Sequence, residues 1–299
     1  MAEPGEALAA IGMLPDVEID PAPAALQLAR LDASGPDWQQ ATEHLSVLAR
    51  DAAAVGAVMS GRSQEARIGA LAGLLHAHHG YRGDVEHYDD LDNANLIRVI
   101  ERRRGLPVAL GVLWLHCIRA AGWEGHGIDF PGHFMVALIA APERVDSRRV
   151  PGIDGDTDRS RHTRQPKRML IDPFGNGASI GSVQLLAMLQ RGGADDIPLT
   201  PGMTRPMATR DVLLRLQRNL VQRRLLAGEL KAALRSLEGM LLIAPDVMAN
   251  WLDAAELNHG IGRMLEARRC LEQVLTKAPS SDAARHAQAR LDAWTRPES

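Results

Sequence analysis

A histidine at the start of one strand-like run and an aspartate at the end of the next are the residues of this sequence that best fit acid–base chemistry. His133 follows a Pro-Gly pair in FPGHFMVAL, and the alternation of that run predicts a β-strand. Asp172 lies in RMLIDPF, the next predicted strand, from which it can hydrogen-bond His133. A carboxylate that orients a histidine is half of a nucleophile–base–acid triad. The alternative interpretation is a structural hydrogen-bonded pair that closes the sheet.

Hydrophobic periodicity predicts the elements that hold this pair. Leu106 to Ala121 is apolar almost all round, has Pro107 in its first turn and stops at Gly122, which predicts a buried central helix. Residues 141–167 are polar and rich in Pro, Gly, Asp and Arg, and predict a mobile loop. The remaining expectations are a disordered N-terminus at 1–20, helices at 22–31, 37–59, 64–79, 96–103 and 183–191, strands at 126–139 and 168–174, a turn at 175–181 and a linker at 192–209.

From Thr209 onward the sequence repeats with a period of 34 residues. The matching positions are Gly228 and Gly262, Ala233 and Ala267, Leu237 and Leu271, Leu241 and Leu275, and Pro245 and Pro279. The period and the Gly, Ala and Pro positions resemble the tetratricopeptide repeat, a helix–turn–helix unit. We therefore predict two such repeats and a capping helix over 209–295, after a first domain at 21–200. The repeats are expected to bind a protein or peptide partner.

Three stretches, taken together, resemble a known family. They are NANLIRVIERRRGLPVALGVLWLHCIRAAG, FPGHFMVAL and LIDPFGNG. Their order resembles the transglutaminase-like fold of the papain-like superfamily and, with the repeats, the bacterial SirB-one family over residues 40–294. The resemblance implies an α+β fold, in which a transglutaminase-like domain with a buried central helix on a small antiparallel sheet precedes α-helical tetratricopeptide-type repeats. The family label also implies regulation of bacterial gene expression.

The nucleophile of that wider superfamily has no counterpart here. Its active members carry a cysteine at the N-terminus of the central helix, where the helix dipole and the histidine lower the thiol pKa. The equivalent position lies near Pro107, and residues 105–115 contain no Cys, Ser, Thr, Lys, Asp or Glu. Cys117 lies about three turns into the helix among apolar residues, and Cys270 takes a core-facing position in the repeats. Both are expected to be packing residues.

These observations predict a non-catalytic scaffold, adaptor or regulatory protein. Such a protein is a pseudoenzyme: no residue is predicted to be catalytic, and His133 and Asp172 are the remnant of a catalytic dyad. The alternative is a papain-like hydrolase or acyl transferase that uses the same pair with an unidentified nucleophile. The segment RRRGLP begins the central helix, where it faces the pocket that the thiol would have occupied. A ligand is therefore expected among Asn95, Arg104, Pro107, His133 and Asp172.

Other features argue against further functional classes. His76, His78, His79 and His87 lack a known metal-ligand spacing, and histidines in the last turn of a helix complement its dipole, so no metal is expected. No GxxxxGK[ST] loop occurs, and no cofactor is expected. The net charge of −3 over 299 residues argues against a nucleic-acid partner. Distant cysteines, no signal-like N-terminus and no apolar run of about 18 residues predict a cytoplasmic protein without membrane contact.

Overall fold

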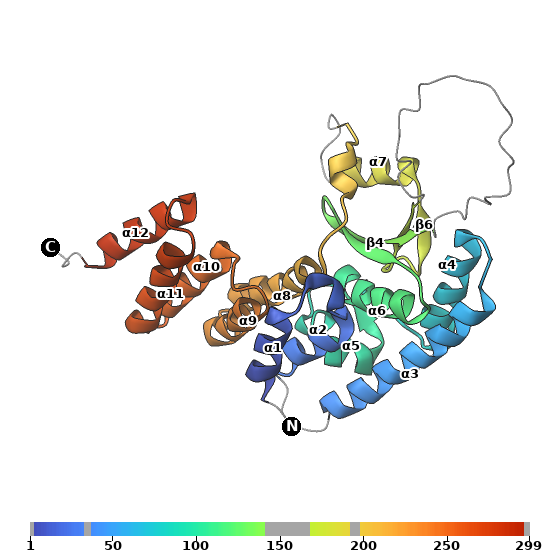
Figure 1. The fold of residues 1–299 in the computed structure, drawn as a ribbon, viewed down its shortest axis with the longest axis horizontal. Helices are drawn as coiled ribbons and strands as arrows, with labels where there is room; N and C mark the ends of the chain where they lie inside the picture. Colours follow the sequence, from blue (N-terminus) through green and yellow to red (C-terminus); the bar gives the residue numbers. More distant parts are fainter. Residues whose placement is uncertain (1–2, 33–36, 141–167, 192–197, 296–299) are drawn as a thin grey trace, which may run out of the picture.

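The computed structural model describes residues 3–32, 37–140, 168–191 and 198–295. Helices pack against a four-stranded sheet, and the last helices extend away from it towards the C-terminus (Figure 1). The α-helices are α1 (Pro4–Met13), α2 (Pro21–Ala29), α3 (Asp37–Val58), α4 (Gln64–Ala72), α5 (Leu96–Arg102), α6 (Pro107–Ala120), α7 (Ser182–Arg191), α8 (Thr209–Leu226), α9 (Leu230–Ile243), α10 (Met248–Gly260), α11 (Met264–Lys277) and α12 (Asp282–Thr295). The strands are β1 (Arg82–Gly83), β2 (Arg104–Gly105), β3 (Gly125–Phe130), β4 (His133–Ile139), β5 (Arg168–Asp172) and β6 (Ala178–Ile180). Short turns of helix are η1 (Asp16–Glu18), the π-helical η2 (Gly73–His78), η3 (Leu91–Asn93) and η4 (Pro201–Thr204).

The central helix α6 confirms the prediction of a buried helix on a small antiparallel sheet. Pro107 is its first residue, where the missing N–H removes a donor that would have no partner inside the helix. Every residue from Pro107 to Ile118 is buried, as an all-round apolar pattern requires. The chain leaves the helix through Gly122, whose φ of 73° suits glycine. The helix therefore runs through the core.

The sheet has the order β3-β4-β5-β6, with every neighbouring pair antiparallel. Alternation divides its side chains between two hydrophobic clusters. The face that joins the cluster around α6 carries Phe134, Val136, Leu138 and Ile171. The opposite face packs with α7 and carries Ile128, Phe130, Met135, Ala137, Ile139 and Leu170. Both faces are covered, which explains why β4 is apolar at six consecutive positions after its histidine.

Two expectations about this sheet are wrong in detail. The single strand expected at 126–139 is a hairpin of β3 and β4, because Pro131 and Gly132 turn the chain and Gly132 has a φ of 71°. The turn expected at 175–181 contains the strand β6, which pairs with β5. The loop expected at 141–167 lies outside the described residues.

The expectation of disorder over residues 1–20 is also wrong for the described part of that segment. It forms α1 and η1, and Leu8 is fully buried. Gly12 lies so close to α9 that an added Cβ would overlap the carbonyl oxygen of Leu242. Asp20 then caps α2 by accepting a hydrogen bond from the N–H of Ala22 at 3.2 Å. Tertiary packing therefore orders a segment that its Pro, Gly and Ala content alone suggested was loose.

The last five helices run α8 to α12, and the sequence period has a counterpart in their geometry. Gly228 and Gly262 both have positive φ angles, of 73° and 80°, in the turns before α9 and α11. Ala233 and Ala267 are both fully buried in the helices that follow. Within the described ranges, no helix combines the length and apolar character needed to cross a membrane.

The main hydrophobic core crosses the boundary that the sequence suggested between two domains. One continuous cluster joins residues of α1, α2 and α6 with residues of α8 and α9. A smaller cluster of Ala255, Leu271, Val274 and Ala287 holds α10, α11 and α12 together. The division at 200 and 209 stays a prediction, but α8 and α9 share their core with the first part of the chain.

Candidate functional site

The structure brings His133 and Asp172 together, although they come from different strands. His133 begins β4 and Asp172 ends β5, and Nε2 of the ring lies 3.1 Å from Oδ1 of the carboxylate. Both side chains are partly buried. This approach does not meet hydrogen-bond geometry, so it is a short contact and not an aligned hydrogen bond. Nε2 is the ring nitrogen that faces the carboxylate.

The environment of Asp172 keeps its carboxyl group ionised. Burial by itself raises the pKa of Asp172, but the contact with His133 and the backbone N–H groups of Gly175 and Phe174 outweigh burial and hold that pKa below its ordinary value. The Phe174 N–H donates to Oδ1 at 2.9 Å. A catalytic dyad requires an ionised aspartate beside a histidine. A purely structural contact between two strands requires the same arrangement.

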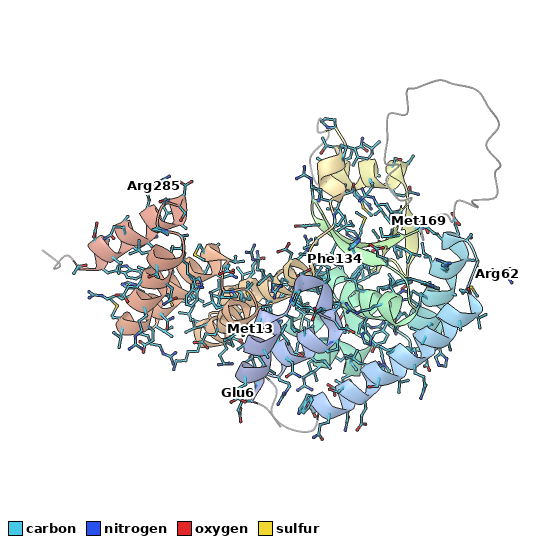
Figure 2. All side chains as sticks on the ribbon, in the orientation of Figure 1. Glu6, Met13, Arg62, Phe134, Met169 and Arg285 are labelled. Carbon is cyan, nitrogen blue, oxygen red and sulfur yellow. The ribbon has the colours of Figure 1, made fainter. Side chains whose placement is uncertain are left out.

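The start of α6, where the sequence analysis placed the position of a nucleophile, carries no Cys, Ser or Thr over residues 107–115. Residues 107–115 of this helix are all buried. Phe134 is the β4 side chain that packs on this part of α6, where the sheet meets the helices (Figure 2). A Cβ added at Gly111 would lie 2.8 Å from Cδ1 of Phe134 and closer still to Cε1. His133 precedes Phe134 and pairs with Phe130, so alternation directs it to the other face of the sheet.

The two cysteines do not replace the missing nucleophile. Cys117 is fully buried in α6, and burial raises the pKa of its thiol to about 12. Cys270 is half-buried in α11, and burial also raises its thiol pKa. Both groups stay protonated at neutral pH, and a thiol is a far weaker nucleophile than a thiolate.

The other predicted ligand residues have local structural positions. Asn95 caps α5, since its Oδ1 accepts the N–H groups of Ile97 at 3.0 Å and Arg98 at 3.3 Å. Pro107 is the buried first residue of α6. Arg104 lies half-buried in β2, in register with Arg82 of β1. The contact between His133 and Asp172 is therefore the part of the expected site that the structure assembles.

Two further side chains, one near Asp172 and one packed beside it on α6, were not predicted as part of this site. His76, in η2, places Nδ1 2.6 Å from the carbonyl oxygen of Tyr81, and its ring centroid lies 5.8 Å from that of Trp114 in α6. Burial lowers the pKa of His76, against a raising effect of the Asp172 charge. Within the described residues, Nε2 of His76 and Nε1 of Trp114 are buried without a hydrogen-bond partner. The sequence shows both residues, but their proximity depends on tertiary packing.

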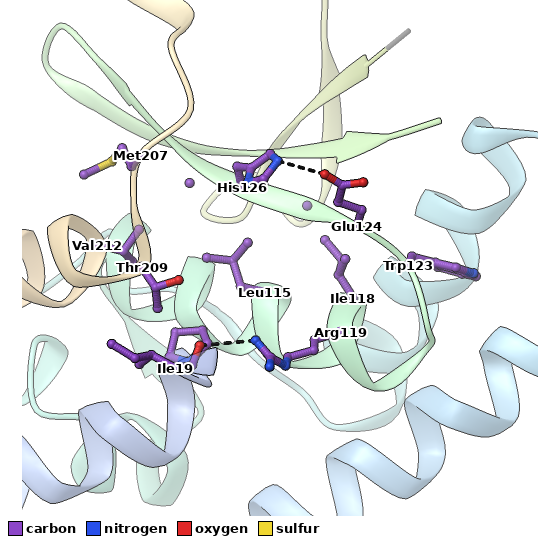
Figure 3. A pocket seen from close by; sticks show the side chains of 13 residues that line it. Ile19, Leu115, Ile118, Arg119, Trp123, Glu124, His126, Met207, Thr209 and Val212 are labelled. Atoms are coloured by element: carbon purple, nitrogen blue, oxygen red, sulfur yellow. Dashed lines mark hydrogen bonds and ion pairs between the residues drawn. The ribbon is translucent and has the colours of Figure 1, made fainter. Parts of the chain in front are cut away.

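A small cavity lies elsewhere, between α6, β3 and the start of α8 (Figure 3). Its volume is about 170 Å³. Figure 3 shows Leu115, Ile118 and Arg119 of α6 facing His126 of β3 across it. None of the five predicted ligand residues lines this cavity.

The sequence profile of the transglutaminase-like superfamily matches residues 39–218, which is more than half of the chain. The chain belongs to the transglutaminase-like superfamily. The match begins in α3, contains α6 and the sheet with His133 and Asp172, and ends within α8.

Curated relatives of this transglutaminase-like chain carry the name "UPF0162 protein". The one from Vibrio cholerae is 34% identical over 117 residues, which cover 39% of this chain and 43% of the relative. One from Xylella fastidiosa is 26% identical over 205 residues, covering 68% of this chain and 64% of the relative. The chain thus spans less than two thirds of the length of these relatives. No solved structure matches it.

Proposed function

We propose that this protein is a non-catalytic scaffold or adaptor of the SirB-one type, in which a transglutaminase-like domain without a nucleophile is joined to tetratricopeptide-type helices that bind a protein segment. The start of α6 carries this proposal. Its first residues are buried, contain no group able to attack a carbonyl, and pack so closely on Phe134 that Gly111 has no room for a side chain. At Gly111 itself, a side chain that carries a thiol or hydroxyl does not fit without displacing the ring.

The contact of His133 with Asp172 has a structural role under this proposal. Asp172 is held from three sides by His133 and by the N–H groups of Gly175 and Phe174. Gly177 of the same turn packs on Trp114, where an added Cβ would lie 2.6 Å from Cζ2. The pair therefore fixes the β5–β6 turn between β4 and the central helix.

Alkylation of the native protein tests the missing nucleophile. A Cys270→Ser variant leaves Cys117 as the single thiol, so one added mass of N-ethylmaleimide reports on Cys117 alone. We expect no modification at pH 7 until urea unfolds the chain. Rapid native modification that slows in a Cys270→Ser, His133→Ala double variant would show that the thiol and the histidine cooperate, and would refute the proposal.

Protein binding is supported by apolar side chains at the turns of the helical region. Leu226, at the end of α8, is 83% exposed and Leu265, near the start of α11, is 58% exposed. Each of these two leucines is therefore a candidate contact for a protein partner. We expect Leu226→Glu and Leu265→Glu to abolish partner capture in pull-downs from bacterial lysate, and Val58→Glu, a change at the exposed end of α3, to leave it unchanged. Equal capture by all three variants would place the binding surface elsewhere.

The alternative is a papain-like hydrolase or acyl transferase, and the ionised Asp172 beside His133 is the observation that favours it. The nitrophenyl esters and anilides of small acyl groups are suitable substrates for the test. Turnover that disappears in His133→Ala and persists in His126→Ala would support an enzyme. Absence of turnover by the unsubstituted protein would rule this alternative out for these substrates and favour the scaffold.

A further inference from the structure

A second group of ionisable side chains lies between α3 and the end of the π-helical turn η2. Asp51 comes from the middle of α3, His78 ends η2 and His79 follows it. One ligand atom from each of the three residues lies within 4.8 Å of the other two. The closest approach, from Nε2 of His79 to Oδ2 of Asp51, is 3.2 Å. Ligand atoms at bonds of about 2.0–2.1 Å in a tetrahedral zinc site are separated by about 3.4 Å, so small side-chain rotations suffice.

The backbone of η2 puts both histidines beside α3. The N–H of His79 bonds the carbonyl of Leu74, five residues back, at 3.0 Å, instead of the carbonyl four residues back. Gly80 then ends the turn with a φ of 76°. His76, on the same turn, contacts Tyr81 and Trp114 instead. Such π-helical turns occur often at functional sites, because the extra residue redirects the side chains that follow.

Neighbouring groups hold two of the candidate ligands in position. Arg50 binds Oδ1 of Asp51 at 3.1 Å, which leaves Oδ2 on the side of His79. The ring of His79 lies between those of His44 and His78, with centroid distances of 5.4 Å and 4.7 Å. Carboxylate ligands of metals are commonly hydrogen-bonded in this way by outer groups, which fix their orientation.

We propose that Asp51, His78 and His79 bind a divalent transition-metal ion of the zinc type. Two imidazole nitrogens and one carboxylate oxygen suit Zn²⁺, Ni²⁺ or Co²⁺ better than Mg²⁺ or Ca²⁺, which prefer oxygen ligands. The ion replaces the contact between His79 and Asp51. Because His78 is exposed, the remaining coordination positions face solvent. The site shares no residue with the pair His133 and Asp172 and does not depend on the scaffold function.

Isothermal titration of the full chain with zinc chloride, without an affinity tag and after chelator treatment, tests the site. We expect one zinc ion per chain, with affinity reduced at least about tenfold by Asp51→Asn and by His79→Gln. The matched control is Glu124→Gln. This change removes the carboxylate from the exposed pair of His126 and Glu124, 3.4 Å apart, and should leave zinc affinity within twofold.

A third variant keeps the test valid if Asp51→Asn or His79→Gln fails to fold. His78 is exposed, so His78→Gln leaves the packing intact and should still weaken zinc binding. Circular dichroism of each metal-free variant checks that it is folded. The proposal is overturned if the unsubstituted chain binds no zinc, if Asp51→Asn, His78→Gln and His79→Gln all bind it with unchanged affinity, or if only Glu124→Gln loses binding.

Discussion

At the scale of single residues, a second histidine–aspartate pair shows how such a contact can join separate helices. Nδ1 of His116 lies 3.1 Å from both carboxylate oxygens of Asp20, and Nε2 lies 3.2 Å from the carbonyl oxygen of Leu45. Only a protonated imidazole donates at both nitrogens. Burial lowers the pKa of His116, but the Asp20 and Leu45 contacts outweigh it and raise the pKa above its ordinary value. The buried side chain of His116 thus links α6 to the N-terminus of α2 and to α3.

The contact of His116 with Asp20 predicts that Asp20→Asn lowers the free energy of unfolding by an amount that depends on pH. Because the folded pKa of His116 is raised, its stabilisation is complete below the unfolded pKa of about 6.5 and is lost as pH rises through the folded pKa. Asparagine still caps α2, so the loss reports on the charge pair. We expect urea unfolding to show a loss of about 1.5–3 kcal/mol at about pH 6 and a smaller loss at about pH 9. The same loss at both pH values would contradict the prediction.

The close packing of Gly111 against Phe134 predicts opposite effects of two glycine-to-alanine changes. Gly111→Ala inserts a methyl group into the ring of Phe134 and should lower the free energy of unfolding by about 1–3 kcal/mol. The control, Gly69→Ala in α4, has open space around its Cβ and should raise it by about 0.5–1 kcal/mol through helix propensity. Urea unfolding at 25 °C measures both. Stabilisation by Gly111→Ala would mean that the helix start has room for a side chain.

At the scale of elements, the sequence predicted the helices and strands whose pattern of apolar residues and turn residues is visible within the segment itself. The all-round apolar run after Pro107 predicted α6 to within one residue at each end. The hairpin of β3 and β4 was missed, although Gly132 marks its turn, because apolar residues continue on both sides. The candidate site residues also fall into those that the sequence could bring together and those that it could not. His133 and Asp172 lie on strands consecutive in the sequence and were paired correctly, whereas Asp51 meets His79 only because α3 folds back on η2.

The N-terminal helix α1 allows a direct test of an element that the sequence did not predict. Leu8 is fully buried within the main core, whereas Met13 of the same helix is 87% exposed. Leu8→Ala should lower the free energy of unfolding by about 2–5 kcal/mol. Met13→Ala, the matched control, should change it by less than about 0.5 kcal/mol. Equal and small effects of both changes in urea unfolding would mean that α1 does not pack on α9 in solution.

At the scale of the whole molecule, the superfamily match and the packing divide the chain at different places. The match ends at residue 218, in the middle of α8. The main core continues through α9, and Arg224 of α8 binds Asp32 beyond α2 at 2.5 Å. The helices α8 and α9 therefore complete the core of the transglutaminase-like part, and they also contain the start of the predicted repeat region. Among the described helices after α9, α10 to α12 share a separate small cluster, although Ala254 of α10 also belongs to the main core.

This arrangement predicts that two truncated chains differ in whether they fold cooperatively. A chain ending at residue 246 lacks α10 to α12 but keeps every buried residue of the main cluster except Ala254, and it should unfold in one cooperative thermal transition at a lowered Tm. A chain ending at residue 208 loses the core residues of α8 and α9 and exposes the apolar faces of α2 and α6 that they cover. The buried residues that it loses include Val212, Leu213, Leu216, Leu220, Leu234, Leu237 and Met240. We expect no cooperative transition and loss of the near-ultraviolet circular dichroism of its three tryptophans, Trp38, Trp114 and Trp123. A chain of 208 residues that melts cooperatively within a few degrees of the longer one would instead establish an independent first domain to which α8 and α9 do not belong.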